Sequence, residues 1–230
     1  MAKRKVQFRE HATLAKLGSF LRLDRFKIVH PKFNPGEMSD PQTLVNVHRG
    51  DAVAGILHIV GQGKQTLLLV EQFRMPTLID AESGLPDLDR IDREHEHAGR
   101  MLELMAGMQQ PGEPWLEAFR RECEEETGFV PDQAEFIGSF YPSPGACSEQ
   151  IHLYYARIDW PDDKEFPETE ADDQRGRGVD NEDIRRHCLS PREFLDMIGD
   201  GRILDGKCFA AAEWMRRPAH YGPIFGLDES

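Results

Sequence analysis

Several features that would place the chain in a special structural class are missing from the sequence. The four cysteines are widely spaced and form no Cys-x-x-Cys pair, which argues against a disulfide framework in a chain of 230 residues. The longest apolar run, at residues 52–60, is far too short to span a membrane. The basic N-terminal segment lacks the apolar core of a signal peptide. These absences predict a cytoplasmic protein with no membrane partner.

The sequence also contains fewer basic than acidic residues. The chain has 28 lysines and arginines against 41 acidic residues, so its formal net charge is -13. Such a balance argues against binding the phosphate backbone of nucleic acids, and we expect no nucleic-acid partner. An anionic substrate would need bound cations or a few well-placed arginines. Hydrophobic residues make up 39% of the chain, an ordinary value for a globular protein.

One stretch, Gly107 to Phe129, carries a specific pattern: GMQQPGEPWLEAFRRECEEETGF. We expect a helix in its middle that ends near Thr127-Gly128. Glu122, Glu125 and Glu126 are spaced i, i+3 and i+4, so their carboxylates share one helical face. Like charges this close destabilise an isolated helix. A cluster of hard oxygen ligands is typical of a site for Mg²⁺ or Mn²⁺.

Strand and helix signals alternate on both sides of this helix. Residues 20–28 and 43–48 predict a small antiparallel β arm with a turn at 34–36. Further strands are expected at 52–60, 66–74, 135–141, 150–158 and 184–189, with a hairpin turn at 61–64, a helix start at Ser190-Pro191 and a last helix at 205–217. The segments 80–99 and 161–179 are charged and rich in turn formers, and we expect solvated loops or insertions there.

The stretch matches Gly-x5-Glu-x7-Arg-Glu-U-x-Glu-Glu-x-Gly-U, where U is an apolar residue, at every fixed position. This pattern resembles the signature of the Nudix hydrolase family. The resemblance implies a fold of the α/β class, in which an α/β/α sandwich is built around a mixed sheet. In this chain the small N-terminal antiparallel β arm would precede that sandwich. It also implies hydrolysis of a nucleoside diphosphate linked to another moiety.

Pyrophosphate hydrolysis agrees with a carboxylate cluster on physical grounds. Water attacks phosphorus while charge builds on the oxygens, and divalent metals neutralise that charge and lower the pKa of a bound water. By the family resemblance, Glu122 and Glu126 are the principal metal ligands, with Glu125 assisting, and the ion is Mg²⁺ or Mn²⁺. Arg121 lies one turn from Glu117 and Glu125, so we expect it to hold carboxylates by charge-assisted hydrogen bonds.

A wider resemblance covers about residues 20–217 and points to the ADP-ribose pyrophosphatase branch of the family. Four local matches carry it: Glu71-Gln72-Phe73-Arg74, Leu104-Met105-Ala106-Gly107-Met108, Ser143-Pro144-Gly145 with Glu149, and Asn181-Glu182-Asp183-Ile184. The branch implies that the carbonyl of Ala106 is a metal ligand. It also implies substrate contacts from Arg49, Arg74, Met108, Gly145 and Glu149.

In this branch the general base comes from the loop before Asn181-Glu182-Asp183-Ile184, so Asp180 and Glu182 compete for the role. The branch usually has glutamate at both places, and this chain has the shorter Asp180 at the first. We expect Glu182 to activate the water, with Asp180 as the rival or as a further metal contact. Glu125 and Arg121 complete the expected catalytic set.

The sequence of the β arm differs from the usual sequence of the ADP-ribose pyrophosphatase branch. Thr43-Leu44-Val45 stands where the branch commonly carries an Arg-Glu pair, whose arginine helps bind substrate across a dimer. The resemblance nevertheless implies a homodimer that exchanges arms of residues 1–48, while residues 49–230 form the Nudix domain. The expected reaction is cleavage of ADP-ribose to AMP and ribose 5-phosphate. GDP-mannose or another nucleoside diphosphate sugar is the alternative substrate. A sensing module without turnover is a third possibility, against which the intact carboxylate set argues.

Overall fold

The computed structural model describes residues 5–19, 21–94, 97–167 and 183–227. The chain divides into two compact units. The first consists of Met1–Ala52 with Ser139–Ile151, and the second of Val53–Gly138 with His152–Ser230. The expected carboxylate helix and most of the central sheet belong to the second unit.

The first unit contains the N-terminal arm as a three-stranded antiparallel sheet of β1 (Gln7–Leu17), β2 (Leu21–Val29) and β3 (Gln42–His48). The sequence predicted β2 and β3 and the small arm, and these are confirmed. It did not predict β1, because two register shifts, between Phe8 and Glu10 and between Thr13 and Ala15, interrupt its alternation.

The main sheet is mixed and runs in the order β10-β5-β4-β9-β8, with β6 on β5 and β7 on β4. Its strands in the described chain are β4 (Ala52–Gly61), β5 (Lys64–Phe73), β6 (Arg100–Glu103), β7 (Met105–Met108), β8 (Glu135–Phe140), β9 (Ile151–Asp159) and β10 (Arg185–Leu189). The predicted hairpin turn between β4 and β5 is confirmed. Its two central residues, Gln62 and Gly63, have φ values of 52° and 71°, the positive values that a tight hairpin turn needs.

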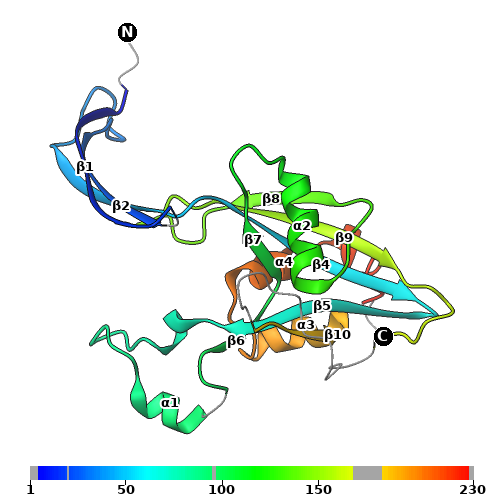
Figure 1. Ribbon diagram of the computed structural model, residues 1–230. Helices are drawn as coiled ribbons and strands as arrows, with labels where there is room; N and C mark the ends of the chain where they lie inside the picture. Colours follow the sequence, from blue (N-terminus) through cyan, green and yellow to red (C-terminus); the bar gives the residue numbers. More distant parts are fainter. Residues whose placement is uncertain (1–4, 20, 95–96, 168–182, 228–230) are drawn as a thin grey trace. The chain divides into compact units, whose positions relative to one another are not determined.

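Helices lie on both faces of this sheet, as an α/β/α sandwich requires. Helix α2 (Trp115–Thr127) lies in front of the sheet in Figure 1, and α3 (Pro191–Gly199) and α4 (Gly206–Met215) lie behind it. Short elements complete the described chain: η1 (Met75–Leu78), α1 (Leu88–Glu94) and α5 (Pro218–Tyr221). Among the described residues, no helix has the length and apolarity that crossing a membrane requires.

Local signals in the sequence account for where these helices begin and end. Gly128 ends α2 with a φ of 77°, a conformation that suits glycine. The Ser190 hydroxyl accepts from the Glu193 N–H at 3.2 Å at the start of α3. Helix α1 lies in the predicted insertion and has no buried residue, which agrees with a solvated segment, although the sequence did not predict a helix there.

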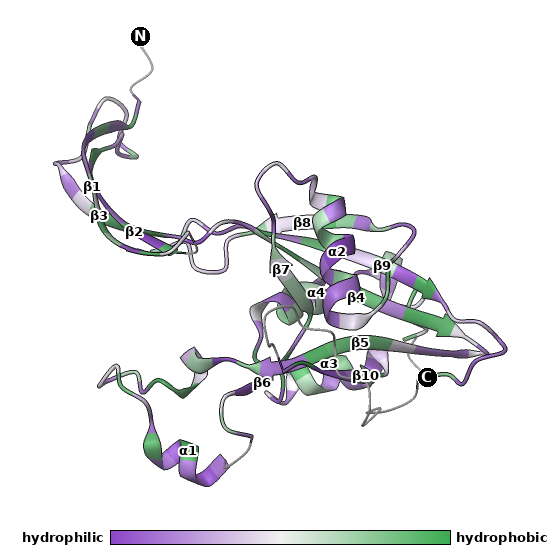
Figure 2. Cartoon of the chain, viewed as in Figure 1, coloured by the Kyte–Doolittle hydropathy of each residue, from purple (hydrophilic) through white to green (hydrophobic). Residues whose placement is uncertain are grey.

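The core between α2 and the sheet fixes the helix that carries the carboxylates. Phe119 is fully buried against Gly55 of β4, where a Cβ atom would lie 2.1 Å from the Phe119 ring. Figure 2 shows apolar residues along β4 and in the middle of β5. The buried Cys123 belongs to this core, and burial raises the pKa of its thiol. All four cysteines are free.

Candidate active site

The C-terminal half of α2 lies against the backbone of β7. The Ala106 N–H donates to Glu126 Oε2 at 3.1 Å. Glu122 lies so close to Gly107 that a Cβ atom there would be 1.9 Å from the Glu122 carboxyl carbon. Glu122 and Glu126 are only 8% and 5% exposed. The missing side chain at Gly107 therefore leaves room for the buried Glu122 carboxylate against the strand. The N–H of the preceding residue, Ala106, holds the Glu126 carboxylate.

Arg121 ties several of these acidic side chains together. Its Nη1 donates to Glu122 Oε1 at 2.7 Å and to Glu125 Oε2 at 3.0 Å. Its Nη2 donates to the Met108 carbonyl at 2.9 Å and to Glu113 Oε2 at 3.1 Å, while Nε donates to Glu113 Oε1 at 3.0 Å. One planar guanidinium thus fixes the orientation of three carboxylates and the end of β7.

Glu113 is the partner of Arg121 that sequence reasoning missed. The hydrogen bond from Arg121 lowers the pKa of Glu113, and Glu113 in turn raises the pKa of Arg121. The available signal was that Glu113 occupies a fixed position of the signature. It precedes the helix, so helical spacing could not pair it with Arg121. Glu117, which spacing did offer, bonds to Arg120 Nη1 at 3.0 Å instead.

The charge of this cluster suits a divalent cation. Within the described residues, no three His, Cys, Asp or Glu side chains are arranged to hold a metal ion as they stand. However, Glu113, Glu122, Glu125 and Glu126 together carry four negative charges and Arg121 carries one positive charge. Two of those carboxylates are buried, where excess charge of one sign is costly. Hard oxygen donors with surplus negative charge fit Mg²⁺ or Mn²⁺.

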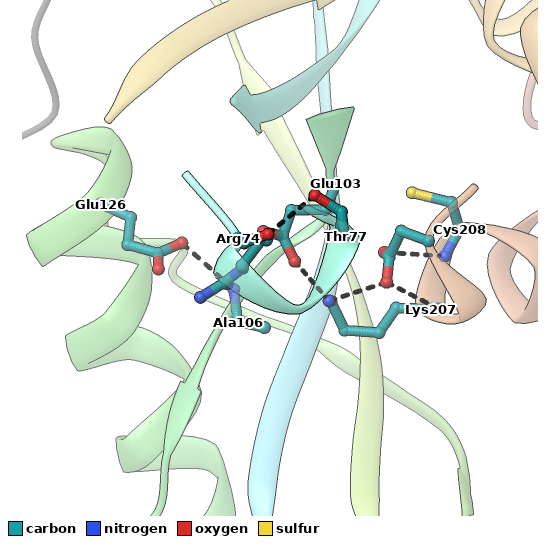
Figure 3. A network of polar contacts seen from close by, with 8 residues as sticks. Arg74, Thr77, Glu103, Ala106, Glu126, Lys207 and Cys208 are labelled. Atoms are coloured by element: carbon teal, nitrogen blue, oxygen red, sulfur yellow. Dashed lines mark hydrogen bonds and ion pairs between the residues drawn. The ribbon is translucent and has the colours of Figure 1, made fainter. Parts of the chain in front are cut away.

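A second polar network surrounds Arg74, just after β5 (Figure 3). Arg74 Nε donates to Glu103 Oε1 at 2.6 Å, and Lys207 Nζ donates to Glu103 Oε2 at 2.7 Å. Lys207 also donates to Asp205 Oδ1 at 2.9 Å. The sequence pointed to Arg74 but not to Glu103 or Lys207. The only sequence signal for Glu103 was its position as a charged residue between Leu102 and Leu104. No sequence signal indicated Lys207.

Three other expected substrate residues belong to the first unit. Arg49 Nε lies 3.4 Å from Glu149 Oε1, so the structure brings these two together. Glu149 is 8% exposed. Gly145 is exposed in a turn in which the Cys147 N–H donates to the Ser143 carbonyl at 2.9 Å.

The two candidates for the general base, Asp180 and Glu182, lie outside the described residues. The next residue, Asp183, accepts from Arg100 Nη2 at 3.0 Å. Which acid activates the water therefore stays a prediction.

Comparison with known proteins identifies a family for the chain. The sequence profile of the NUDIX domain matches residues 50–197. The chain is 36% identical over 179 residues to a GDP-mannose pyrophosphatase of Yersinia enterocolitica, covering 78% of this chain and 76% of that one. It is 32% identical over 159 residues to a GDP-mannose pyrophosphatase of Pectobacterium atrosepticum, covering 69% of each.

A solved structure of an ADP compounds hydrolase has the same fold. The two chains superpose with a TM-score of 0.58 at 17% identity, and the match covers 94% of this chain and 97% of that one.

Proposed function

The chain belongs to the Nudix family, and we propose that it hydrolyses the pyrophosphate bond of a nucleoside diphosphate sugar with the help of Mg²⁺ or Mn²⁺. The observation that carries this proposal is the pair of buried carboxylates, Glu122 and Glu126, set against Ala106 and Gly107. Arg121 supplies one positive charge to this cluster, and burial of the remaining negative charge is costly unless a further cation offsets it.

Glu122, Glu126 and the Ala106 carbonyl would hold the ion, with Glu125 assisting. When bound, the ion neutralises charge on the phosphoryl oxygens and lowers the pKa of a bound water. The task of Arg121 is to keep Glu122 and Glu125 oriented, through its bonds of 2.7 and 3.0 Å. For the general base we propose Glu182, with Asp180 as the alternative.

We assign binding of the substrate's diphosphate to the end of β5. The Arg74 side chain is 38% exposed there, so its guanidinium is within reach of a dissolved anion. Two residues earlier, the Gln72 side-chain nitrogen is buried and has no hydrogen-bond partner among the described residues. Such a donor costs about 1–3 kcal/mol when it stays unsatisfied. A substrate oxygen would offset that cost.

For the nucleoside we propose GDP-mannose first and ADP-ribose second. The names of the related proteins support GDP-mannose. The missing arginine in the arm, at Thr43-Leu44-Val45, weakens the case for ADP-ribose that the local sequence matches made. The order expected from the sequence is therefore reversed.

A substrate panel tests this proposal. Purified protein with Mg²⁺ is offered GDP-mannose, ADP-ribose and a dinucleotide, and products are identified by ³¹P NMR. We expect GMP and mannose 1-phosphate from GDP-mannose at the highest kcat/KM, because only the pyrophosphate bond is cleaved. A faster reaction with ADP-ribose would support the second candidate. No turnover of any compound would favour a sensing module.

We also propose that the chain forms a homodimer through the β arm of residues 1–48. The arm exposes Leu14 (50%) and Leu17 (69%) on a sheet of three strands, which is too thin to bury a core of its own. We expect a mass in solution of twice 26.3 kDa. The double variant Leu14→Asp, Leu17→Asp should shift the mass toward that of one chain, as light scattering on an eluting peak would measure.

A matched control comes from the insertion, where Leu85 and Leu88 are similarly exposed, at 64% and 68%. The variant Leu85→Asp, Leu88→Asp should remain dimeric. A monomeric mass for the unchanged chain, or a dimer that survives the arm substitutions, would contradict the role of the arm.

A further inference from the structure

We propose that Glu103 and Lys207 are positioning residues that hold the Arg74 guanidinium in place for the substrate's diphosphate. This inference rests on the proposed function, because it takes Arg74 as a substrate contact. It adds two residues to the site, from β6 and α4, that the signature does not contain.

The backbone of Arg74 is fixed on both sides. Its N–H donates to the Gly99 carbonyl at 2.7 Å, and its own carbonyl accepts from the Thr77 N–H at 3.0 Å and the Thr77 hydroxyl at 2.8 Å. These bonds join Arg74 to Gly99, the end of the insertion, and to Thr77 in η1 before it. The long side chain still has several rotatable bonds, so the backbone alone cannot fix the guanidinium.

Glu103 restrains that side chain through one carboxylate oxygen and binds Lys207 through the other. The distances are 2.6 Å to Arg74 Nε and 2.7 Å to Lys207 Nζ, and Glu103 is only 2% exposed. With a cation on each oxygen, the carboxylate cannot rotate without breaking a charge-assisted bond. A bond at Nε restrains the direction in which the planar guanidinium points.

Lys207 is itself held and stays charged. Its Nζ lies 2.9 Å from Asp205 Oδ1, and the Asp205 carboxylate also accepts from the backbone N–H groups of Lys207 and Cys208 at the start of α4. Burial lowers the pKa of Lys207, but the charges of Glu103 and Asp205 outweigh burial and raise it. The lysine is therefore a permanent counter-ion to Glu103.

Stability alone does not explain such a network. Buried ion pairs lose much of their attraction to the cost of removing charges from water, and apolar side chains of similar volume often serve as well. The position of Glu103 in the chain offers a better reason. Glu103 is followed three residues later by Ala106, whose N–H binds Glu126 (Figure 3). One short segment thus links the support of Arg74 to the carboxylate site.

A double-mutant cycle in enzyme kinetics tests the inference. We expect Arg74→Ala and Glu103→Gln each to raise KM for GDP-mannose about tenfold with a smaller change in kcat, since ground-state binding is lost. The double variant should be no worse than Arg74→Ala within about twofold, because Glu103 acts only through Arg74. Lys207→Met should behave like Glu103→Gln, and Lys207→Arg should restore most of the lost affinity.

A matched ion pair supplies the control. Arg90 Nε also lies 2.6 Å from a glutamate, Glu94 Oε1, and the Arg90 side chain is also 38% exposed. Glu94→Gln should leave KM unchanged. Circular dichroism and the melting temperature establish that each variant is folded.

The inference is overturned if the effects of Arg74→Ala and Glu103→Gln multiply in the double variant, which would indicate independent roles. It is also overturned if Glu103→Gln leaves KM unchanged, or if Arg74→Ala does. In those cases the unchanged chain still hydrolyses the substrate, so the proposed function stands. Absence of turnover in the unchanged chain would instead remove the proposed function, and this inference with it.

Discussion

Replacing Glu126 by Gln is expected to lower kcat at least about a hundredfold, since removal of even an outer partner of a metal site costs 10–100-fold. Glutamine has nearly the same shape, and its carbonyl oxygen can still accept from the Ala106 N–H, as Glu126 Oε2 does at 3.1 Å. The negative charge that a divalent ion requires is lost. The measurement is kcat for GDP-mannose hydrolysis at saturating Mg²⁺, together with the melting temperature.

Glu124 provides a control on the same helix. Its side chain is exposed and lies outside the carboxylate cluster around Arg121. Glu124→Gln therefore removes one charge from α2 without touching β7, and it should retain nearly full activity. Near-normal kcat in the Glu126→Gln variant would refute the assignment of this carboxylate to the metal site.

Adding one methyl group at Gly107 should have an effect of similar size. The new Cβ atom would lie 1.9 Å from the Glu122 carboxyl carbon and 2.0 and 2.2 Å from its oxygens. The end of a glutamate side chain can rotate away, so we expect Gly107→Ala to fold but to displace the carboxylate. Because Glu122 is a proposed metal ligand, its displacement should lower kcat about a hundredfold, while the melting temperature changes by only a few degrees.

Gly199→Ala is the matched control, because a Cβ atom at Gly199 would meet nothing within 4 Å. This variant should keep both activity and stability. If Gly107→Ala retained full activity, the close approach of Glu122 to β7 would have no part in the reaction. If Gly107→Ala failed to fold, the clash would lie in the core and not at the end of a movable side chain.

Local chemistry explains which elements the sequence could predict. The end of α2 at Gly128, the start of α3 at Ser190-Pro191 and the turn at Gln62-Gly63 each depend on neighbouring residues. A few neighbouring residues in the sequence are therefore enough to predict each of these features. The sequence did not predict strand β1, because its bulges shift side chains from one face of the sheet to the other. The register of β1 is seen only in its pairing with β2.

The contacts of the candidate site likewise include some that the sequence could predict and others that it could not. Arg121 with Glu125 follows from helical spacing, and Glu122 and Glu126 follow from the signature. The Lys207–Glu103 ion pair joins residues 104 positions apart, and no local pattern can signal it. The closeness of Glu122 to Gly107 likewise depends on how α2 packs against β7, which the sequence does not reveal.

Binding of Mn²⁺, followed by electron paramagnetic resonance, tests the central claim without relying on turnover. The signal of free Mn²⁺ is lost on binding, so a titration gives the affinity of the unchanged chain and of the Glu126→Gln and Gly107→Ala variants. If Glu122 and Glu126 hold the ion against Ala106 and Gly107, both variants should bind it at least about tenfold more weakly than the unchanged chain. Equal affinities in all three proteins would place the metal elsewhere and contradict the account.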